Sequence, residues 1–245
     1  MKKIFFTLCF WVTFSVIAAQ DSSGLSDSKI IETPLVSPTS NEKARFAYNK
    51  GSELLKAGDF DNAIKLLLEA VKEDPNYTDA MDHLGIAYRN LKKYDEAVKW
   101  YKKSISIKPE STAAYINLAL VYSFQGKKQE SIDTYKKIIE LEPDNPEGYY
   151  GIGRVYFINR DYEESISYTD KAIQKYLDQG SSYIYDALYI QGLNFYNISN
   201  WKEALKCFEI LVRAYPEDAK IKKIHNEIMT KIKKDDKASD STSVK

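Results

Sequence analysis

The sequence has few of the residues on which catalytic and metal sites depend. Its 245 residues include two histidines and two cysteines. It contains no HExxH zinc motif, no GxxxxGK[ST] phosphate loop and no GxSxG nucleophile motif. We therefore expect no metal site, no cofactor and no catalytic activity.

An excess of charge of one sign is also missing. The 35 lysines and arginines are balanced by 35 aspartates and glutamates. Nucleic acids and acidic membranes attract proteins mainly through a strongly basic surface. The balance therefore argues against nucleic acid as a partner.

A long apolar run occurs at the N-terminus, where two lysines precede 16 residues that are largely apolar and end in small side chains. This order is typical of a secretory signal, and the run is short for a membrane span, which takes about 20 residues. We predict that residues 1–19 are a signal peptide and that the protein is exported to the periplasm or cell envelope. The alternative is an uncleaved segment that anchors the protein in the inner membrane. Without the signal, Cys207 is the only cysteine, so an internal disulfide is excluded and a buried apolar role is expected.

The regions that flank the body of the chain lack an apolar period. Residues 20–40 are rich in serine and aspartate and contain two prolines, which predicts a flexible tether. Order is expected from residue 41 on, because Thr39 and Glu42 have the spacing of a capping box and an amphipathic stretch follows. The polar residues 235–245 are predicted to be a disordered tail.

The body of the chain is repetitive with a period of 34 residues. The small residues of one column are Gly51, Gly85, Ala119 and Gly153. The prolines of a second column are Pro75, Pro109 and Pro143. Gly192 and Pro216 continue both columns after an insertion of five residues within 173–184. One connection should therefore be longer than the others.

Each unit contains two segments with helical spacing of apolar residues. Short turns are expected between them, at 57–59, 91–93, 126–128, 159–161 and 198–200. Each unit is therefore predicted to be a helical hairpin. Small residues that recur on both helices predict a close approach of the pair, beside large side chains such as Tyr101, Tyr135 and Phe208.

These columns resemble the tetratricopeptide repeat. The second unit matches best, with Met81, Leu84, Gly85, Tyr88, Ala97, Tyr101 and Pro109. The fourth unit departs from the pattern at Thr169, where an aromatic residue is expected. The resemblance implies an all-α, right-handed α-solenoid of about five helix-turn-helix repeats. The repeats are placed at about 44–77, 78–111, 112–145, 146–184 and 185–218.

After the last repeat, residues 219–234 place four isoleucines on one helical face, with polar residues on the others. A helix that is apolar on one side is what a solenoid needs to close its exposed end. We predict a C-terminal capping helix over 219–234.

The resemblance also implies that the first helix of each repeat lines a concave groove that binds a protein or peptide partner. The groove residues carried over are Tyr48, Ile86, Arg89, Ile116, Leu120, Tyr150, Arg154, Phe157, Tyr189, Leu193 and Tyr196. Arg89 or Arg154 would capture acidic groups of a bound helix or extended peptide. The alternative occupant of the groove is the chain's own tether.

The function predicted from these observations is a non-catalytic scaffold or adaptor that binds a peptide or helix in its concave groove. One alternative is a structural protein that assembles with copies of itself into a homo-oligomer. Another is an accessory subunit that recruits substrate for a separate envelope enzyme. Contact with a membrane is expected only if the signal segment stays uncleaved.

Overall fold

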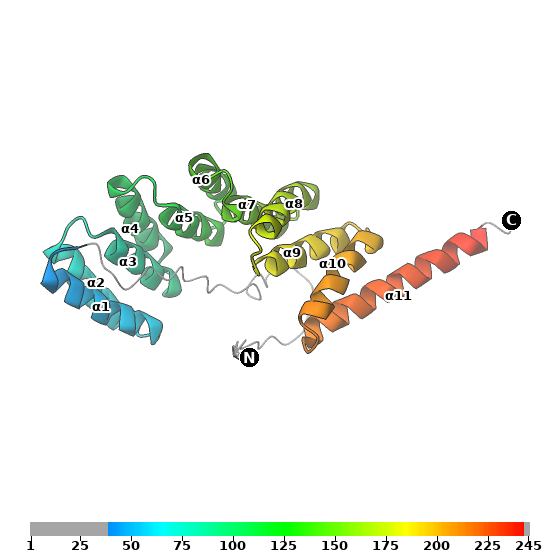
Figure 1. Cartoon of the computed structure of the whole chain (residues 1–245), viewed down its shortest axis with the longest axis horizontal. Helices are drawn as coiled ribbons and strands as arrows, with labels where there is room; N and C mark the ends of the chain where they lie inside the picture. Colours follow the sequence, from blue (N-terminus) through cyan, green and yellow to red (C-terminus); the bar gives the residue numbers. More distant parts are fainter. Residues whose placement is uncertain (1–38, 243–245) are drawn as a thin grey trace. The chain divides into compact units, whose positions relative to one another are not determined.

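The computed structural model describes residues 39–242, with side chains up to Asp235. The predicted signal peptide, residues 20–38 of the tether and residues 243–245 lie outside the described residues. Between residues 39 and 242 the chain forms eleven α-helices and no strand (Figure 1). The helices are α1 (Glu42–Lys56), α2 (Phe60–Glu73), α3 (Thr78–Asn90), α4 (Tyr94–Ile107), α5 (Thr112–Phe124), α6 (Lys128–Leu141), α7 (Pro146–Ile158), α8 (Tyr162–Asp178), α9 (Ile184–Asn197), α10 (Trp201–Ala214) and α11 (Ala219–Thr242).

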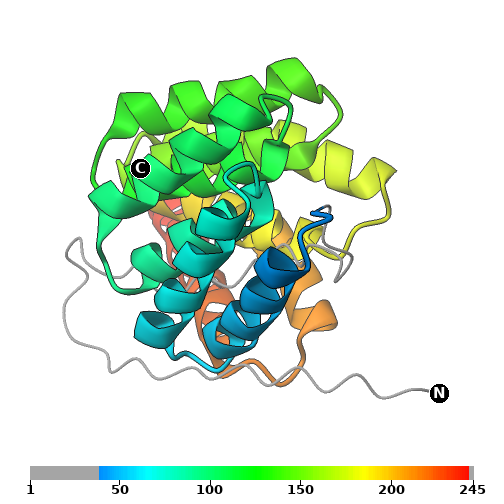
Figure 2. The same ribbon diagram turned by 90° about the vertical axis from the view of Figure 1, so that its left-hand side faces the viewer.

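The helices pair as hairpins, which confirms the interpretation of each repeat as helix-turn-helix. Each odd-numbered helix from α1 to α9 packs against the helix that follows it. Figure 2, seen from the end formed by α1 and α2, shows the first pair side by side. Every turn within a hairpin contains one residue with positive φ. These residues are Gly58, Lys92, Gly126, Arg160 and Ser199, so three turns place a side chain where glycine is favoured.

The close approach predicted within the hairpins is confirmed at the glycine column. A Cβ added at Gly192 would lie 2.8 Å from Cε2 of Phe208. A Cβ at Gly85 would overlap the ring of Tyr101. Because Tyr101 and Phe208 are fully buried, neither ring can move into solvent to make room.

Successive hairpins stack into an all-α solenoid. Each second helix packs against the first helix of the next repeat, and the first helices α1, α3, α5, α7 and α9 also contact one another in order (Figure 1). The second helices α2, α4, α6 and α8 make no comparable contacts with one another within the described part of the chain. The first helices therefore form the more tightly packed layer of the stack.

The five inserted residues are distributed over two helices and their connection. Helix α8 has 17 residues, whereas the other second helices have 14. The connection from α8 to α9 is five residues long and the equivalent connections are four, while α9 begins one residue early. The prediction of a longer connection is thus confirmed, although this connection exceeds the others by only one residue. Residues 173–178 have no proline or glycine, so the helix absorbs most of the insertion.

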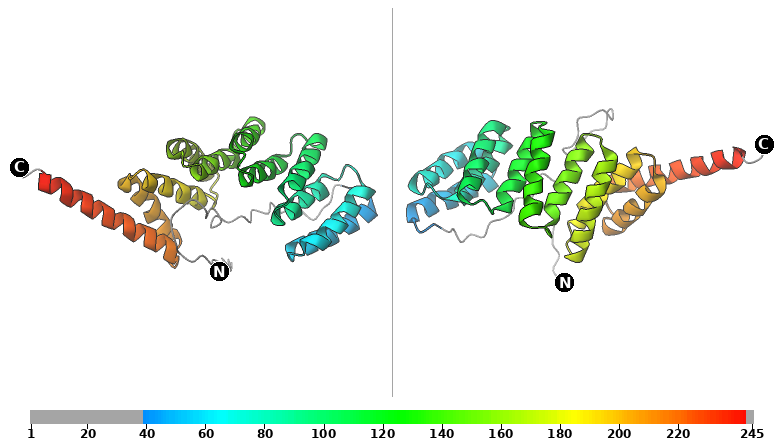
Figure 3. Two further views of the ribbon diagram at one scale, coloured as in Figure 1. Left: turned by 180° about the vertical axis from the view of Figure 1, so that it is seen from behind. Right: turned by 90° about the horizontal axis from the view of Figure 1, so that it is seen from above.

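Both ends of the solenoid differ from the predictions. The capping box is wrong, because Asn41 caps α1: its Oδ1 accepts hydrogen bonds from the backbone N–H groups of Lys43 (3.0 Å) and Ala44 (3.1 Å). Helix α11 continues to Thr242, so residues 235–242 are helical and only the last three residues of the predicted tail lie outside the described part. Since α11 has 24 residues and α10 has 14, the last turns of α11 extend past α10 (Figure 3).

Candidate functional site

Eight of the eleven predicted groove residues are partly exposed on the first helices of the last three repeats. We call these eight the first-helix face. They are Ile116 and Leu120 on α5, Tyr150, Arg154 and Phe157 on α7, and Tyr189, Leu193 and Tyr196 on α9. Because α5 contacts α7 and α7 contacts α9, the residues at equivalent repeat positions lie on neighbouring helices.

The other three predicted groove residues are buried in the first two repeats. Tyr48 is 4%, Ile86 5% and Arg89 8% exposed. The Tyr48 ring packs against those of Tyr77 and His83, with 4.9 Å between centroids in each case. The Nη1 of Arg89 donates a hydrogen bond to Oδ1 of Asn117 (3.3 Å). These side chains join neighbouring repeats, so the structure does not offer Arg89 to an acidic ligand.

Arg154 is the arginine of the first-helix face, and its guanidinium group lies over an aromatic ring. Its guanidinium carbon lies 5.7 Å from the ring centroid of Tyr150, within the range of a cation–π interaction. Tyr150 packs edge-on against Tyr176, with centroids 6.2 Å apart. The hydroxyl of Tyr176 donates to Oε1 of Glu147. Burial raises the pKa of Tyr150 above its usual range.

The hydroxyl and amide groups between the fourth and fifth repeats form a buried polar network that the sequence did not predict. The hydroxyl of Thr169, in place of the expected aromatic residue, contacts Oε1 of Gln191, and Nε2 of Gln191 donates to Asp170. Nδ2 of Asn194 donates to Oγ of Ser165 (2.7 Å). Gln191 stands where the second, third and fourth repeats have leucine or isoleucine, so the two departures from the pattern compensate each other across the interface.

Asp82 of α3 occupies the same repeat position as Ile116, Tyr150 and Tyr189. Its Oδ1 is buried and has no hydrogen-bond partner among the described residues. Burial raises the pKa of Asp82 to about 7; Asp79 adds to this increase, while Ser104 and Lys108 oppose it. The adjacent His83 shifts the other way, because burial and Lys56 lower its pKa to about 4.

The two shifts have opposite effects on stability. Between pH 3.8 and about 7 the native state keeps a proton on Asp82 that the unfolded state has released, so this contribution to stability is lost as pH rises. Between pH 6.5 and about 4 the unfolded state binds a proton on His83 that the native state does not. The His83 contribution is therefore lost as pH falls.

Replacing Asp82 by asparagine should isolate the contribution of Asp82 to the pH dependence of stability. We expect the free energy of unfolding of Asp82→Asn, relative to the unmodified protein, to increase by on the order of 2 kcal/mol between pH 4 and pH 7.5. Urea unfolding at several pH values, followed by circular dichroism, measures this difference. The substitution Asp61→Asn, at an exposed position of α2, controls for the loss of one negative charge. Parallel stability curves for Asp82→Asn and the unmodified protein would contradict the assignment.

Residues 39–242 contain no cluster of three or more histidine, cysteine, aspartate or glutamate side chains able to hold a metal ion. Among the helices described, none is both long enough and apolar enough to span a membrane. Cys207 is buried, as predicted, and burial raises the pKa of its thiol to about 12. The raised pKa favours the protonated thiol over the reactive thiolate at neutral pH.

Comparisons with known proteins agree with this architecture. Four family models, each described as tetratricopeptide repeat, match residues 48–112, 112–145, 134–167 and 186–218. None of the curated proteins matches the chain.

Among solved structures, a MamA protein shares 26% sequence identity with this chain. The match has a TM-score of 0.58 and covers 73% of this chain and 95% of the MamA chain. A MamA from Desulfovibrio magneticus RS-1 is 20% identical, with a TM-score of 0.60 over 73% and 98% of the two chains. A tetratricopeptide repeat protein from Parabacteroides merdae is 19% identical, with a TM-score of 0.64 over 80% and 76%. The latter two similarities concern the fold alone.

Proposed function

Because the chain belongs to the tetratricopeptide repeat family, whose members generally bind other proteins, we propose that it is a non-catalytic interaction scaffold that binds a peptide or helix of a partner protein along the first-helix face. The observation that carries this proposal is the alignment of partly exposed apolar and aromatic side chains on α5, α7 and α9. Aromatic residues and arginine are common anchors of binding energy in protein interfaces.

The character of the face favours an amphipathic partner segment. Apolar side chains such as Leu120, Phe157 and Leu193 would bury the apolar side of that segment, and Arg154 would pair with an acidic group on it. A polar segment without apolar residues would leave these side chains in contact with water and gain little. The partner is therefore expected to present apolar residues at helical or alternating spacing.

The test compares two pairs of substitutions with the same chemistry. Leu120→Glu combined with Phe157→Glu places charge on the first-helix face. Leu68→Glu combined with Ile210→Glu does so on the exposed second helices α2 and α10, where these residues are 38% and 41% exposed. Photo-crosslinking in native cells, followed by mass spectrometry, should yield a partner that the first pair loses by at least tenfold and the second retains. If both double variants captured the partner equally, the first-helix face would not be the binding site.

Self-association is the competing explanation and has a separate measurement. Sedimentation analysis over a hundredfold range of concentration should give a constant monomer mass if the face serves another protein. A mass that rises with concentration and returns to that of a monomer in the Leu120→Glu, Phe157→Glu variant would assign the face to a second copy of the chain.

We also propose that the protein acts outside the cytoplasm, in the periplasm or cell envelope. The basis is the order of a basic start, a short apolar run and small residues in the first 19 positions. Amino-terminal sequencing of the protein from fractionated cells should find a mature chain that begins close to Gln20 in the soluble envelope fraction. An intact N-terminus in the membrane fraction would support the anchored alternative, and recovery in the cytoplasm would contradict export.

A further inference from the structure

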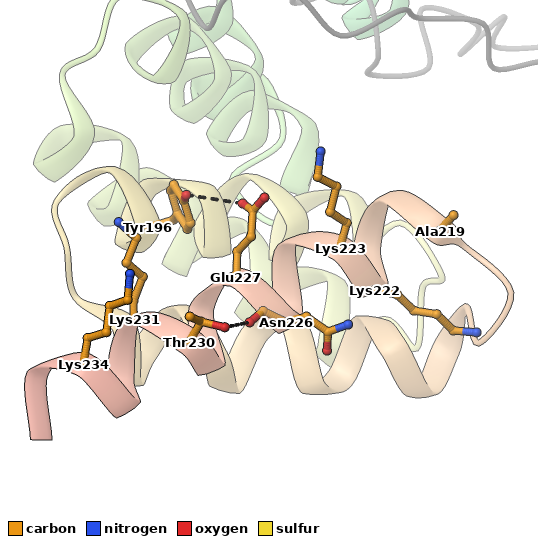
Figure 4. A pocket seen from close by; sticks show the side chains of 9 residues that line it. All are labelled: Tyr196, Ala219, Lys222, Lys223, Asn226, Glu227, Thr230, Lys231 and Lys234. Atoms are coloured by element: carbon orange, nitrogen blue, oxygen red, sulfur yellow. Dashed lines mark hydrogen bonds between the residues drawn. The ribbon is translucent and has the colours of Figure 1, made fainter. Parts of the chain in front are cut away.

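A groove lies between α9 and α11, at the C-terminal end of the solenoid (Figure 4). It has a volume of about 610 Å³. Its lining residues are Tyr196, Ala219, Lys222, Lys223, Asn226, Glu227, Thr230, Lys231 and Lys234. All but Tyr196 belong to α11, so the capping helix supplies most of the surface.

The groove exists because α11 packs differently from the first helices of the repeats. It begins where a sixth repeat would start its first helix, 34 residues after position 185. Ile221 and Ile228 bury its apolar side in a cluster that includes side chains of both α9 and α10. Yet α11 makes no contact with α9 comparable to those between earlier first helices. The separation of α9 and α11 leaves the space between them open on one side.

The wall formed by α11 is strongly basic. Residues 219–234 contain six lysines and one glutamate. Lys222, Lys223, Lys231 and Lys234 line the groove, and the close-up view shows them along one helix (Figure 4). No acidic side chain of the described residues forms an ion pair with Lys222 or Lys234. From residue 222 to residue 234 the helix rises by about 18 Å.

Two side chains of α11 that line the groove contact residues of α9 and α10. Nζ of Lys231 lies 5.7 Å from the ring centroid of Trp201, which is within cation–π range and directs that ammonium group toward α10. The hydroxyl of Tyr196 donates to Oε2 of Glu227 at 3.5 Å, so the single glutamate is engaged by α9 (Figure 4). The other charged side chains that line the groove are all lysines.

We propose that the α9–α11 groove binds an acidic segment of a partner protein. Charge complementarity carries this inference, because carboxylates spaced along an extended peptide can each approach a lysine of α11. A rise of about 18 Å matches five or six residues of extended chain. The site goes beyond the proposed function, since it shares only Tyr196 with the first-helix face.

Lipid and nucleic acid fit the groove less well than a peptide. The apolar side of α11 is buried against α10, so this helix has no free apolar face to insert into a bilayer. The groove contains no arginine to bind phosphate with two parallel hydrogen bonds. The amide of Asn226 and the carboxylate of Glu227 can instead pair with the backbone of a peptide.

Fluorescence anisotropy can test the proposal with a labelled decapeptide of alternating glutamate and serine. We expect the purified protein to bind this peptide, to bind its glutamine counterpart at least tenfold more weakly, and to lose affinity between 50 and 200 mM salt. Lys222→Glu combined with Lys234→Glu should weaken binding at least fivefold. Lys72→Glu with Lys99→Glu, on exposed positions of α2 and α4, makes the same change in charge and should leave affinity unchanged.

The outcomes separate the alternatives. No binding of the acidic peptide, or an equal loss in both double variants, would overturn the proposal. Binding to vesicles of phosphatidylglycerol and phosphatidylcholine, or to a single-stranded oligonucleotide, without binding to the peptide would assign the basic wall to lipid or nucleic acid instead. The Leu120→Glu, Phe157→Glu variant should bind the acidic peptide normally, so failure of the first-helix face and failure of this groove give different results.

Discussion

Replacing Tyr101 by alanine is expected to lower the free energy of unfolding by about 3–5 kcal/mol. The side chain is fully buried between α3 and α4, and its ring lies directly against Gly85. Since glycine has no side chain that could move into the vacated space, a cavity the size of the ring would remain. Denaturant unfolding followed by circular dichroism measures the loss, and a decrease below 1 kcal/mol would show that the hairpin collapses around the gap.

Tyr101→Phe is the matched control for this substitution. The Tyr101 hydroxyl is buried and has no hydrogen-bond partner among the described residues. Removing it discards a polar group that lost its water on folding without a replacement, so the cost should be near zero or the protein should gain stability. If phenylalanine were as destabilising as alanine, the hydroxyl and not the packing of the ring would be the source of stability.

Replacing Gly151 by leucine is expected to destabilise the protein by about 3 kcal/mol, the upper part of the range for overpacking. Gly151 lies on α7, and any Cβ at this position would overlap the ring of Tyr135 on α6. That ring is 4% exposed and belongs to the preceding repeat, so it cannot turn away without opening the interface between repeats. The same unfolding measurement applies.

A double variant identifies the cause of this loss. Combined with Tyr135→Ala, which empties the space opposite, Gly151→Leu should cost at least 1 kcal/mol less than it does alone. Additive losses would show that leucine harms the helix itself and not the packing between repeats. The prediction concerns a contact between repeats, whereas the glycine column at Gly85 and Gly192 concerns contacts within a hairpin.

The sequence alone determined the architecture of the solenoid. A period of 34 residues, two helical segments per unit and columns of small and large residues predicted the hairpins, their turns and their closest contacts. This was sufficient because each repeat packs against itself and its neighbours only, so the pattern within one unit already describes most of its contacts. The insertion near residue 180 was found from the same two columns.

The tertiary structure decided which side chains remain accessible. Tyr48 and Arg89 share repeat positions with Tyr150 and Phe157, respectively, yet the first pair is buried and the second is partly exposed. The difference arises from the particular side chains that surround each position, such as Asn117 beside Arg89, and a repeat pattern does not contain this information. Binding by the eight accessible residues stays a prediction.

Two further features depended on distances that periodicity cannot express. Gly151 does not belong to the column of small residues with the 34-residue period, and its close approach to Tyr135 accounts for a glycine at this position. The lysines of residues 219–234 could be counted in the sequence, but the groove that they line depends on how far α11 stands from α9. The sequence thus fixes local structure and neighbour contacts through its period, while exposure and the shape of a binding surface follow from packing between elements.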